Sequence, residues 1–455
     1  MGVKTENKMA YEPVNKLIIQ MSAPPLISMF FQYSYNLVDS MFVAGINEQA
    51  LAAVSLAFPI TTLMNALSVW IGVGVNVLIA GYLGQKNQQK ANSAAALGVV
   101  ISVVVGVLIN FLSLFIINPY YSAFTQNKEI FEYGIAYMSV CVFMQIPNMV
   151  HIVIQKILQA TGNMIAPMWF QIAGVVFNFV FDPLLIFGIG PFPKMGVVGA
   201  AVATVLGYVV STIIALIQLF LTKQKVKPVF KNCLEPKMIK LIFSYGLPSF
   251  VMNALGAFTV NFANMFLVRY SDTAGGFFGG YFKGILIAFF GAYFKVQQLI
   301  FMTVNGLIQG CLPIMRFNYR AKEYGRLKQA NKSGTIIATV MMIVGMLLVL
   351  IFPKEILFLF SASEEMCAFG VSAMRIMSLG FVFSGFSAMI ATYEQATDSI
   401  MPGVVVQLLR QGVLLVPVIW LLNSAVQMTG IWLAFPITEF VTFLVAVVFA
   451  KIKNH

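Results

Sequence analysis

The chain has 455 residues, of which 59% are hydrophobic and 10% are charged. A soluble domain carries about 25% charged residues, so this composition excludes a soluble protein and indicates a membrane protein. The net charge of +12 does not indicate a nucleic-acid partner, because the basic residues gather in alternate loops between apolar stretches.

Twelve apolar stretches of roughly 20 residues or more are each long enough to cross about 30 Å of hydrocarbon as a helix. They cover approximately residues 15–44, 53–82, 91–117, 132–158, 166–190, 196–222, 241–269, 283–315, 333–353, 370–394, 402–422 and 429–450. The sequence therefore predicts an all-α membrane protein with twelve transmembrane helices.

The first predicted helix, 15–44, carries polar side chains at helical spacing. Gln32, Tyr35, Asn36 and Asp39 share one helical face. A carboxylate inside the bilayer costs at least about 2.5–3.5 kcal/mol, so a functional role is the default for Asp39. We expect the other three to line a substrate cavity, and the alternative is a polar packing seam between helices.

The fifth predicted helix, 166–190, holds the second acid of the first half. Asn178 lies four residues before Asp182 and hence on the same face. Carboxylate and amide oxygens together suit a proton or a Na⁺ ion. We predict that Asp39, Asn178 and Asp182 bind the coupling cation in one chamber, in the outer half of the bilayer.

Three prolines lie inside these two predicted helices. Pro24 and Pro25 are in the first, and Pro183 directly follows the aspartate of the fifth. Proline cannot donate a backbone hydrogen bond and tends to kink a helix, so we expect these positions to act as hinges.

A Lys-rich segment at 223–240 contains Pro228 and Pro236 and divides the chain. We predict an N-terminal lobe at 1–222, a cytoplasmic linker at 223–240 and a C-terminal lobe at 241–455. The linker is either a tether between moving lobes or a solvated basic loop beside anionic headgroups.

The second half differs in its ionisable residues. Asn264 stands where the first half has its helix 1 aspartate, so the cation chemistry is expected in the first half. We place Asn264, Lys295 and Glu439 among the candidates for the substrate cavity. Lys295 and Arg410 are candidate ion-pair partners for Glu394 or Glu439.

The halves repeat each other. Gln159-Ala160-Thr161 returns 236 residues later as Gln395-Ala396-Thr397, and Gln89-Lys90-Ala91-Asn92 is echoed by Lys328-Gln329-Ala330-Asn331. Duplicated units are typical of secondary transporters. Six spans per half predict two pseudo-symmetric six-helix lobes related by an axis along the membrane normal.

Basic residues concentrate in both terminal tails, in the linker and in the loops after the second and eighth spans. The positive-inside rule then places both termini in the cytoplasm of a multi-pass plasma-membrane protein, which we expect to be a monomer. The sequence has no phosphate-binding loop and no paired cysteines, so we expect no cofactor and a dependence on an ion gradient.

Five motifs in this order resemble the multidrug and toxic compound extrusion (MATE) family over essentially the whole chain. They are Pro24-Pro25 followed by Asp39, Leu51-Ala52-Ala53-Val54-Ser55 leading to Pro59, Gln159-Ala160-Thr161-Gly162-Asn163 with Pro167, Asn178 with Asp182-Pro183, and Gly199-Ala200-Ala201-Val202-Ala203-Thr204. The resemblance implies two six-helix lobes in a V shape that export organic cations or amphipathic drugs against H⁺ or Na⁺ by alternating access.

In the DinF-like branch of that family the cation site is in the N-terminal lobe. The matching positions are Asp39, Asn178, Asp182 and Thr204. Asn264 departs from the NorM-like branch, which uses acids of the C-terminal lobe. The branch leaves Glu439 without a role.

Two other functions compete with cation-coupled export. Related architectures include flippases for lipid-linked sugars, although these favour a basic cavity over buried acids. An intramembrane aspartyl enzyme would need Asp39 and Asp182 within hydrogen-bond reach, but neither lies in a Gly-x-Gly-Asp context. We therefore expect a transporter and not an enzyme.

Overall fold

A computed structural model of the protein describes residues 7–143, 145–231, 233–273, 279–360 and 362–453. Side chains within these ranges are described except at 37, 48, 143, 257–273, 279–284, 287, 411, 427 and 452–453. Every regular element in the described ranges is a helix, which agrees with the all-α prediction.

A short N-terminal helix, α1 (Lys8–Tyr11), precedes the first bundle. The elements of this bundle are α2 (Val14–Ala44), α3 (Glu48–Gly84), α4 (Gln88–Phe124), α5 (Lys128–Phe143), α6 (Gln145–Ala160), α7 (Ile165–Phe187) and α8 (Val197–Leu221).

The second bundle begins after the linker. Its elements are α9 (Pro236–Thr273), α10 (Gly279–Arg320), α11 (Tyr324–Ile351), α12 (Pro353–Leu359), α13 (Glu364–Ser378), α14 (Phe381–Ala396), α15 (Ile400–Leu408), a π-helix (Leu409–Val413) and α16 (Leu415–Lys453).

All twelve predicted spans fall on helices. In the described ranges, nine helices are long and apolar enough to cross a membrane, or ten if α5 and α6, bent by 46°, form one span. Although α2 is not among them, its 31 residues extend about 46 Å.

The end of the eleventh predicted span and the whole of the twelfth lie on α16, and the chain turns back on itself between them. A Cβ atom at Gly430 would lie 2.2 Å from the carbonyl oxygen of Leu422, whereas eight residues of straight helix extend about 12 Å. The helical assignment therefore continues through a sharp reversal between two antiparallel segments.

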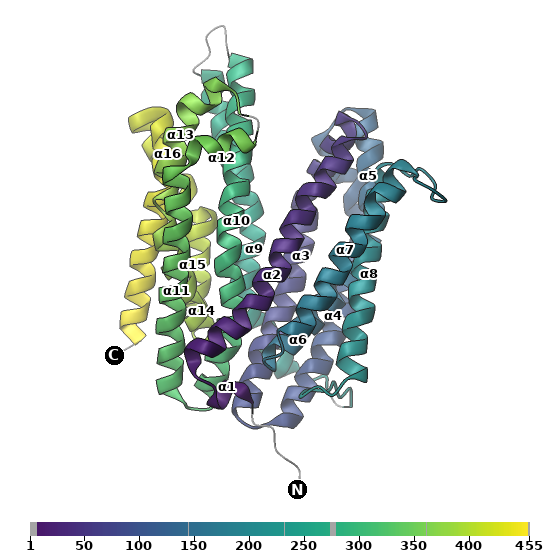
Figure 1. The fold of residues 1–455 in the computed structure, drawn as a ribbon, viewed down its shortest axis with the longest axis vertical. Helices are drawn as coiled ribbons and strands as arrows, with labels where there is room; N and C mark the ends of the chain where they lie inside the picture. The colour runs from purple at the N-terminus through teal and green to yellow at the C-terminus, as the bar shows by residue number, and fades with distance from the viewer. Residues whose placement is uncertain (1–6, 144, 232, 274–278, 361, 454–455) are drawn as a thin grey trace.

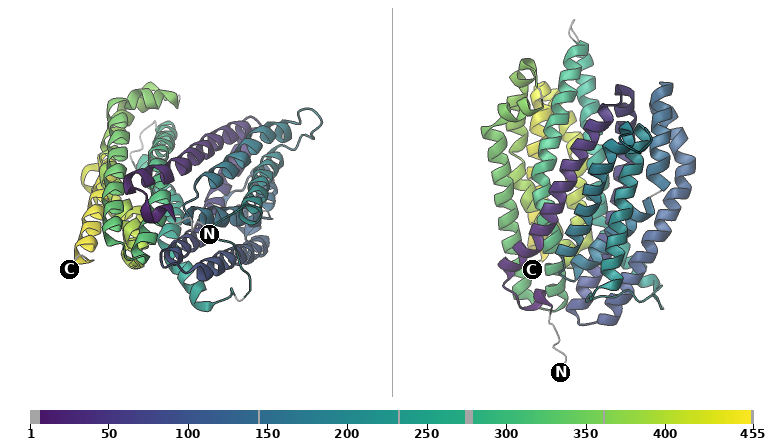
Figure 2. Two further views of the ribbon diagram at one scale, coloured as in Figure 1. Left: turned by 60° about the horizontal axis from the view of Figure 1, so that its bottom comes forward. Right: turned by 45° about the vertical axis from the view of Figure 1, so that its right-hand side comes forward.

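The two bundles meet at the end that holds the N-terminus and diverge toward the opposite end (Figure 1, Figure 2). Helices α3 and α9 pack together, as do α2 and α10. We call this contact between α2–α3 and α9–α10 the seam. Within the first bundle, α7 packs against both α2 and α8.

Glycines allow close backbone contact at the seam. A Cβ atom at Gly74 of α3 would lie 2.0 Å from the carbonyl oxygen of Ile242, and one at Gly84 would lie 2.3 Å from that of Phe317. On the other side of the contact, a Cβ atom at Gly310 of α10 would meet the backbone of α2 at 2.9 Å. Small residues commonly allow such approach between membrane helices.

The backbone repeats the duplication that the sequence predicts. Lys86 and Lys322, 236 residues apart, have φ angles of 57° and 63°. Gly162 and Asp398, each directly after a Gln-Ala-Thr copy, are also 236 residues apart and have φ angles of 87° and 65°. Residues other than glycine seldom adopt this conformation, so the same two turns are built once in each half.

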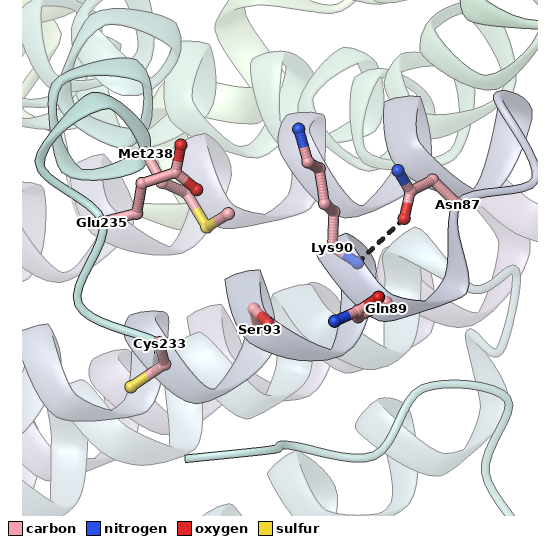
Figure 3. Close-up of a pocket in the computed structure, with 7 residues that line it drawn as sticks. All are labelled: Asn87, Gln89, Lys90, Ser93, Cys233, Glu235 and Met238. Atoms are coloured by element: carbon pink, nitrogen blue, oxygen red, sulfur yellow. Dashed lines mark hydrogen bonds between the residues drawn. The ribbon is translucent and has the colours of Figure 1, made fainter. Parts of the chain in front are cut away.

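The linker packs against the start of α4. The side-chain amide of Gln88 donates to the carbonyl of Lys225 at 2.7 Å, and the backbone N–H of Val229 donates to that of Asn92 at 3.3 Å. A cavity of about 240 Å³ lies between the start of α4 and the linker end, where Lys90 and Glu235 are among the lining residues (Figure 3).

Candidate functional site

Three helices of the first bundle bring predicted site residues together. The Tyr35 hydroxyl of α2 donates to Asp182 Oδ2 of α7 at 3.0 Å. The same hydroxyl lies 3.5 Å from Thr204 Oγ1 of α8. Asp182 is fully buried, so this hydrogen bond replaces water for one of its oxygens. Tyr35, predicted for the substrate cavity, thus lies among the residues predicted for the cation.

Asp39 completes the cluster one helical turn after Tyr35. Its carboxyl group lies close to the side chains of both Asp182 and Tyr35. Two carboxylates this close repel each other strongly, and such pairs hold a shared proton or a neutralising cation. The arrangement can therefore take up and release one positive charge.

Three oxygen atoms of the predicted cation site lack a hydrogen-bond partner within the described part of the chain. They are Asp39 Oδ1, Asn178 Oδ1 and Asp182 Oδ1, and all three are buried. Unpartnered buried oxygens are costly, and carboxylate and amide oxygens are the ligands of hard cations. These residues thus fit a Na⁺ ion as well as a proton.

A small cavity of about 50 Å³ adjoins the cluster inside the first bundle. It has room for a water molecule or an ion but is far smaller than a drug-sized site. The lining residues are Gln32, Tyr35, Asn36, His151, Gln171, Gly174, Val175, Asn178, Gly207, Tyr208 and Ser211.

The predicted hinge prolines lie within continuous helices. Pro24 and Pro25 are inside α2, and Pro183 is inside α7. The hydroxyl of Ser28 donates to the carbonyl oxygen of Pro25 at 3.0 Å. Their role as hinges stays a prediction.

The second-half candidates belong to other surroundings. Arg410 Nε lies 3.0 Å from Glu439 Oε1, and the guanidinium stacks over Phe301 at 4.8 Å from the ring centroid. Lys295 is exposed on α10. The side chain of Asn264 lies outside the described residues.

Sequence reasoning missed two polar groups near the seam. Lys156 of α6 is buried, and its Nζ donates to Gln309 Oε1 of α10 at 2.9 Å. Arg316 of α10 is 1% exposed and lies 2.7 Å from Asp398 Oδ1. The charge of Lys156 inside the predicted span 132–158 was the available signal, because buried charges are costly in a membrane.

A family model, MatE, matches this chain twice, over residues 24–184 and 248–421. The chain is 24% identical over 423 residues to the multidrug export protein MepA of Staphylococcus aureus (strain MSSA476), covering 92% of this chain and 89% of MepA. It is 25% identical over 444 residues to MepA of Staphylococcus haemolyticus (strain JCSC1435), covering 97% of this chain and 94% of that protein.

Solved structures show the same fold. A multidrug resistance MATE family transporter in an outward-facing conformation superposes with a TM-score of 0.89 at 24% identity, covering 100% of this chain and 98% of that one. A MOP superfamily transporter from Pyrococcus furiosus gives 0.90 at 24% identity with the same coverage. The expected V-shaped pair of bundles is thereby confirmed, and the family match and the MepA relatives confirm the expected transporter. With both halves matched separately, this chain belongs to the MatE family of multi-span membrane transporters.

Proposed function

We propose that this protein exports amphipathic, mostly cationic organic compounds across the cell membrane by alternating access, in exchange for H⁺ or Na⁺. The proposal depends on the hydrogen bond from Tyr35 to Asp182, with the carboxyl group of Asp39 close by and with buried oxygens that lack a partner among the described residues. A site that must hold one positive charge can couple its filling to a change of shape.

The coupling ion would bind in the first bundle. A proton would sit on one carboxyl group of the Asp39–Asp182 pair, which removes the repulsion between them. A Na⁺ ion would instead take oxygens from these acids and Asn178, with Thr204 as a further ligand. Either ion is cargo that enters from one side and leaves on the other.

The substrate would occupy the space between the bundles. The small cavity of about 50 Å³ beside the acids suits the ion and water, so a bulky compound needs another site. The names of the Staphylococcus relatives, multidrug export proteins, support compounds of varied shape. We expect a monomer with both termini in the cytoplasm, and the linker as a tether between the bundles.

Ethidium efflux from proteoliposomes tests the proposal, with a proton gradient and a sodium gradient imposed separately. We expect export under one gradient at least, and the effective gradient identifies the ion. Export under neither gradient would contradict coupled antiport and favour the lipid-linked sugar flippase, which a fluorescent glycolipid assay would then detect.

Matched substitutions locate the ion site. Asp182→Asn should abolish gradient-driven export, because the amide cannot exchange a proton and weakens a Na⁺ site. Tyr35→Phe removes a hydrogen bond to a charged group, worth about 1.5–3 kcal/mol, and should slow export about tenfold or more. Glu132→Gln, at an exposed acid of α5, is the control and should leave ion coupling intact. If Asp182→Asn exports at the wild-type rate, the site is elsewhere.

A further inference from the structure

Lys156 is a buried amine at the junction of the two bundles. It lies near the end of α6, and a Cβ atom at Gly72 of α3 would meet its Cγ at 2.9 Å. Its Nζ donates to Gln159 Oε1 of its own helix at 3.0 Å and to Gln309 Oε1 of the second bundle at 2.9 Å. The backbone carbonyl of Lys156 accepts from Asn76 at 2.9 Å.

The partners of this amine within the described residues are neutral amides. The salt bridges of the described residues do not include Lys156. Gln159 also donates to Gln309 at 3.0 Å, and Gln309 in turn contacts Met29 of α2. A buried charge normally has a counter-ion, because desolvation disfavours the charged form. Within the described part of the chain, Lys156 has hydrogen bonds but no salt bridge to an acid.

Other titratable groups on the surrounding elements are engaged elsewhere. His151 of α6 stacks on Tyr208 with ring centroids 5.8 Å apart. Arg316 of α10 is paired with Asp398. Helices α2 and α3 present Met29, Gly72 and Asn76 here, which do not titrate. The Asp39–Asp182 pair is a separate site, since Asp182 lies about 26 Å along α7 from its start and Lys156 about 6 Å from the end of α6.

The position of Lys156 links its charge to the seam. Gln309 belongs to the second bundle, so parting of the bundles removes this acceptor and admits water to the amine. Water stabilises the ammonium, whereas closure returns the amine to a dry, uncompensated site. A group that binds a proton more tightly in one arrangement shifts the equilibrium toward that arrangement as pH falls.

We propose that the amine of Lys156 is a second proton-binding site of this transporter, filled when the bundles part at the seam and emptied when they close. The ligand is a proton, and its uptake favours opening on the side of the N-terminus. The proposal rests on the alternating access proposed above, but not on which cation the aspartates bind.

The test measures the separation of the bundles directly. Spin labels are placed at Gln89 and Lys328, which are exposed beyond the seam on α4 and α11, in protein reconstituted into nanodiscs. The background carries Asp39→Asn and Asp182→Asn, so that any remaining pH dependence comes from outside that pair. Distance distributions are recorded from pH 5 to pH 9.

We expect the open-to-closed ratio in this background to rise up to tenfold per pH unit on acidification, the limit for uptake of one proton. Lys156→Met should remove this dependence and stay closed. Gln309→Met removes an acceptor that the amine has only across the closed seam, so the closed arrangement loses stability and the opening midpoint should move to higher pH. The two variants thus have opposite effects, which a general loss of folding would not produce.

Unchanged pH dependence in Lys156→Met, or a shift to lower pH in Gln309→Met, would overturn the proposal. If Lys156→Met does not fold, the sign of the Gln309→Met shift decides alone. Ethidium efflux with the aspartates intact keeps the two hypotheses apart. If gradient-driven export is retained but opening of the labelled protein does not depend on pH, only the proposal for Lys156 is contradicted.

Discussion

Asp398 sits among cationic side chains at the base of the second bundle. It accepts a hydrogen bond from the Tyr245 hydroxyl and pairs with Arg316 at 2.7 Å and Arg320 at 3.2 Å. Burial alone would raise the pKa of Asp398, but these three partners outweigh burial and hold the pKa below its usual range. Arg316 is almost fully buried, so the carboxylate neutralises a charge that water cannot reach.

The lowered pKa of Asp398 predicts how this pairing depends on pH. A carboxyl group with a lower pKa in the folded state stabilises the fold above its unfolded pKa of about 3.9, and this contribution is lost as pH falls below that value. Asp398→Asn should therefore lower the free energy of unfolding at pH 7 by about 1–3 kcal/mol. The difference from wild type should shrink toward pH 3.

Thermal unfolding in detergent at a series of pH values measures this difference. Glu132→Gln is the control, because the Lys128–Glu132 pair is 90% and 64% exposed and exposed pairs contribute little. A penalty for Asp398→Asn that is as large at pH 3 as at pH 7 would show that the carboxylate charge is not the cause.

The sequence indicates single site residues only where a local signal exists. Asp39, Asn178 and Asp182 stand out because acids and amides at helical spacing are rare in apolar spans, and the structure places the two acids close together. Lys156 and Asp398 depend on partners about 80 to 150 residues away, such as Gln309 and Arg316. No spacing rule relates positions that only the packing of bundles brings together.

Among the helices, α3 depends on glycine at the two positions, Gly74 and Gly84, where its backbone closely approaches the second bundle. A Cβ atom at Gly74 would overlap the carbonyl of Ile242, a backbone atom that cannot rotate away. Alanine is otherwise favoured over glycine in a helix by about 0.5–1 kcal/mol. If a Gly→Ala change in α3 lowers the stability of the protein, the closed seam is therefore populated. If the change raises the stability, the closed seam is not populated.

Gly74→Ala should destabilise the closed arrangement by about 1–3 kcal/mol, the usual cost of overpacking. It should lower the melting temperature or move the Gln89–Lys328 distance to longer values. Gly291→Ala, inside α10 with no atom within 4 Å of the added Cβ, is the control and should be neutral or stabilising. Equal effects of the two changes would mean that the seam does not constrain α3.

Helix positions follow from hydrophobic length, so the twelve spans were predictable, but breaks within them were not. The 46° bend between α5 and α6 and the π-helix at Leu409–Val413 lie inside apolar stretches without a loop signature. Gly430 allows the reversal of α16 because the chain passes 2.2 Å from where its Cβ would be. Such features depend on packing against neighbouring helices. The pattern of apolar residues along the sequence carries no information about that packing.

For the whole molecule, the seam and the basic residues lie at the same end. The turn between α3 and α4, which contains Lys86, and the turn between α10 and α11, which contains Lys322, lie at this end together with α1 (Figure 1). The opposite end carries few cations, among them Lys128 and Lys354. Basic loops stay in the cytoplasm during insertion, so the closed side should face the cytoplasm.

Labelling with a membrane-impermeant maleimide tests this orientation. Gln89→Cys and Lys128→Cys place one exposed thiol at each end, and the unmodified chain measures the background from its own four cysteines, three of which are buried. In intact cells Lys128→Cys should react and Gln89→Cys should not, with the reverse in inverted vesicles. Because the bundles diverge away from the seam, that result would mean that this arrangement opens outward, as an exporter does when it releases its substrate. Reaction of Gln89→Cys in intact cells would mean that the seam faces the outside of the cell. That result would contradict the predicted orientation and the proposed direction of transport.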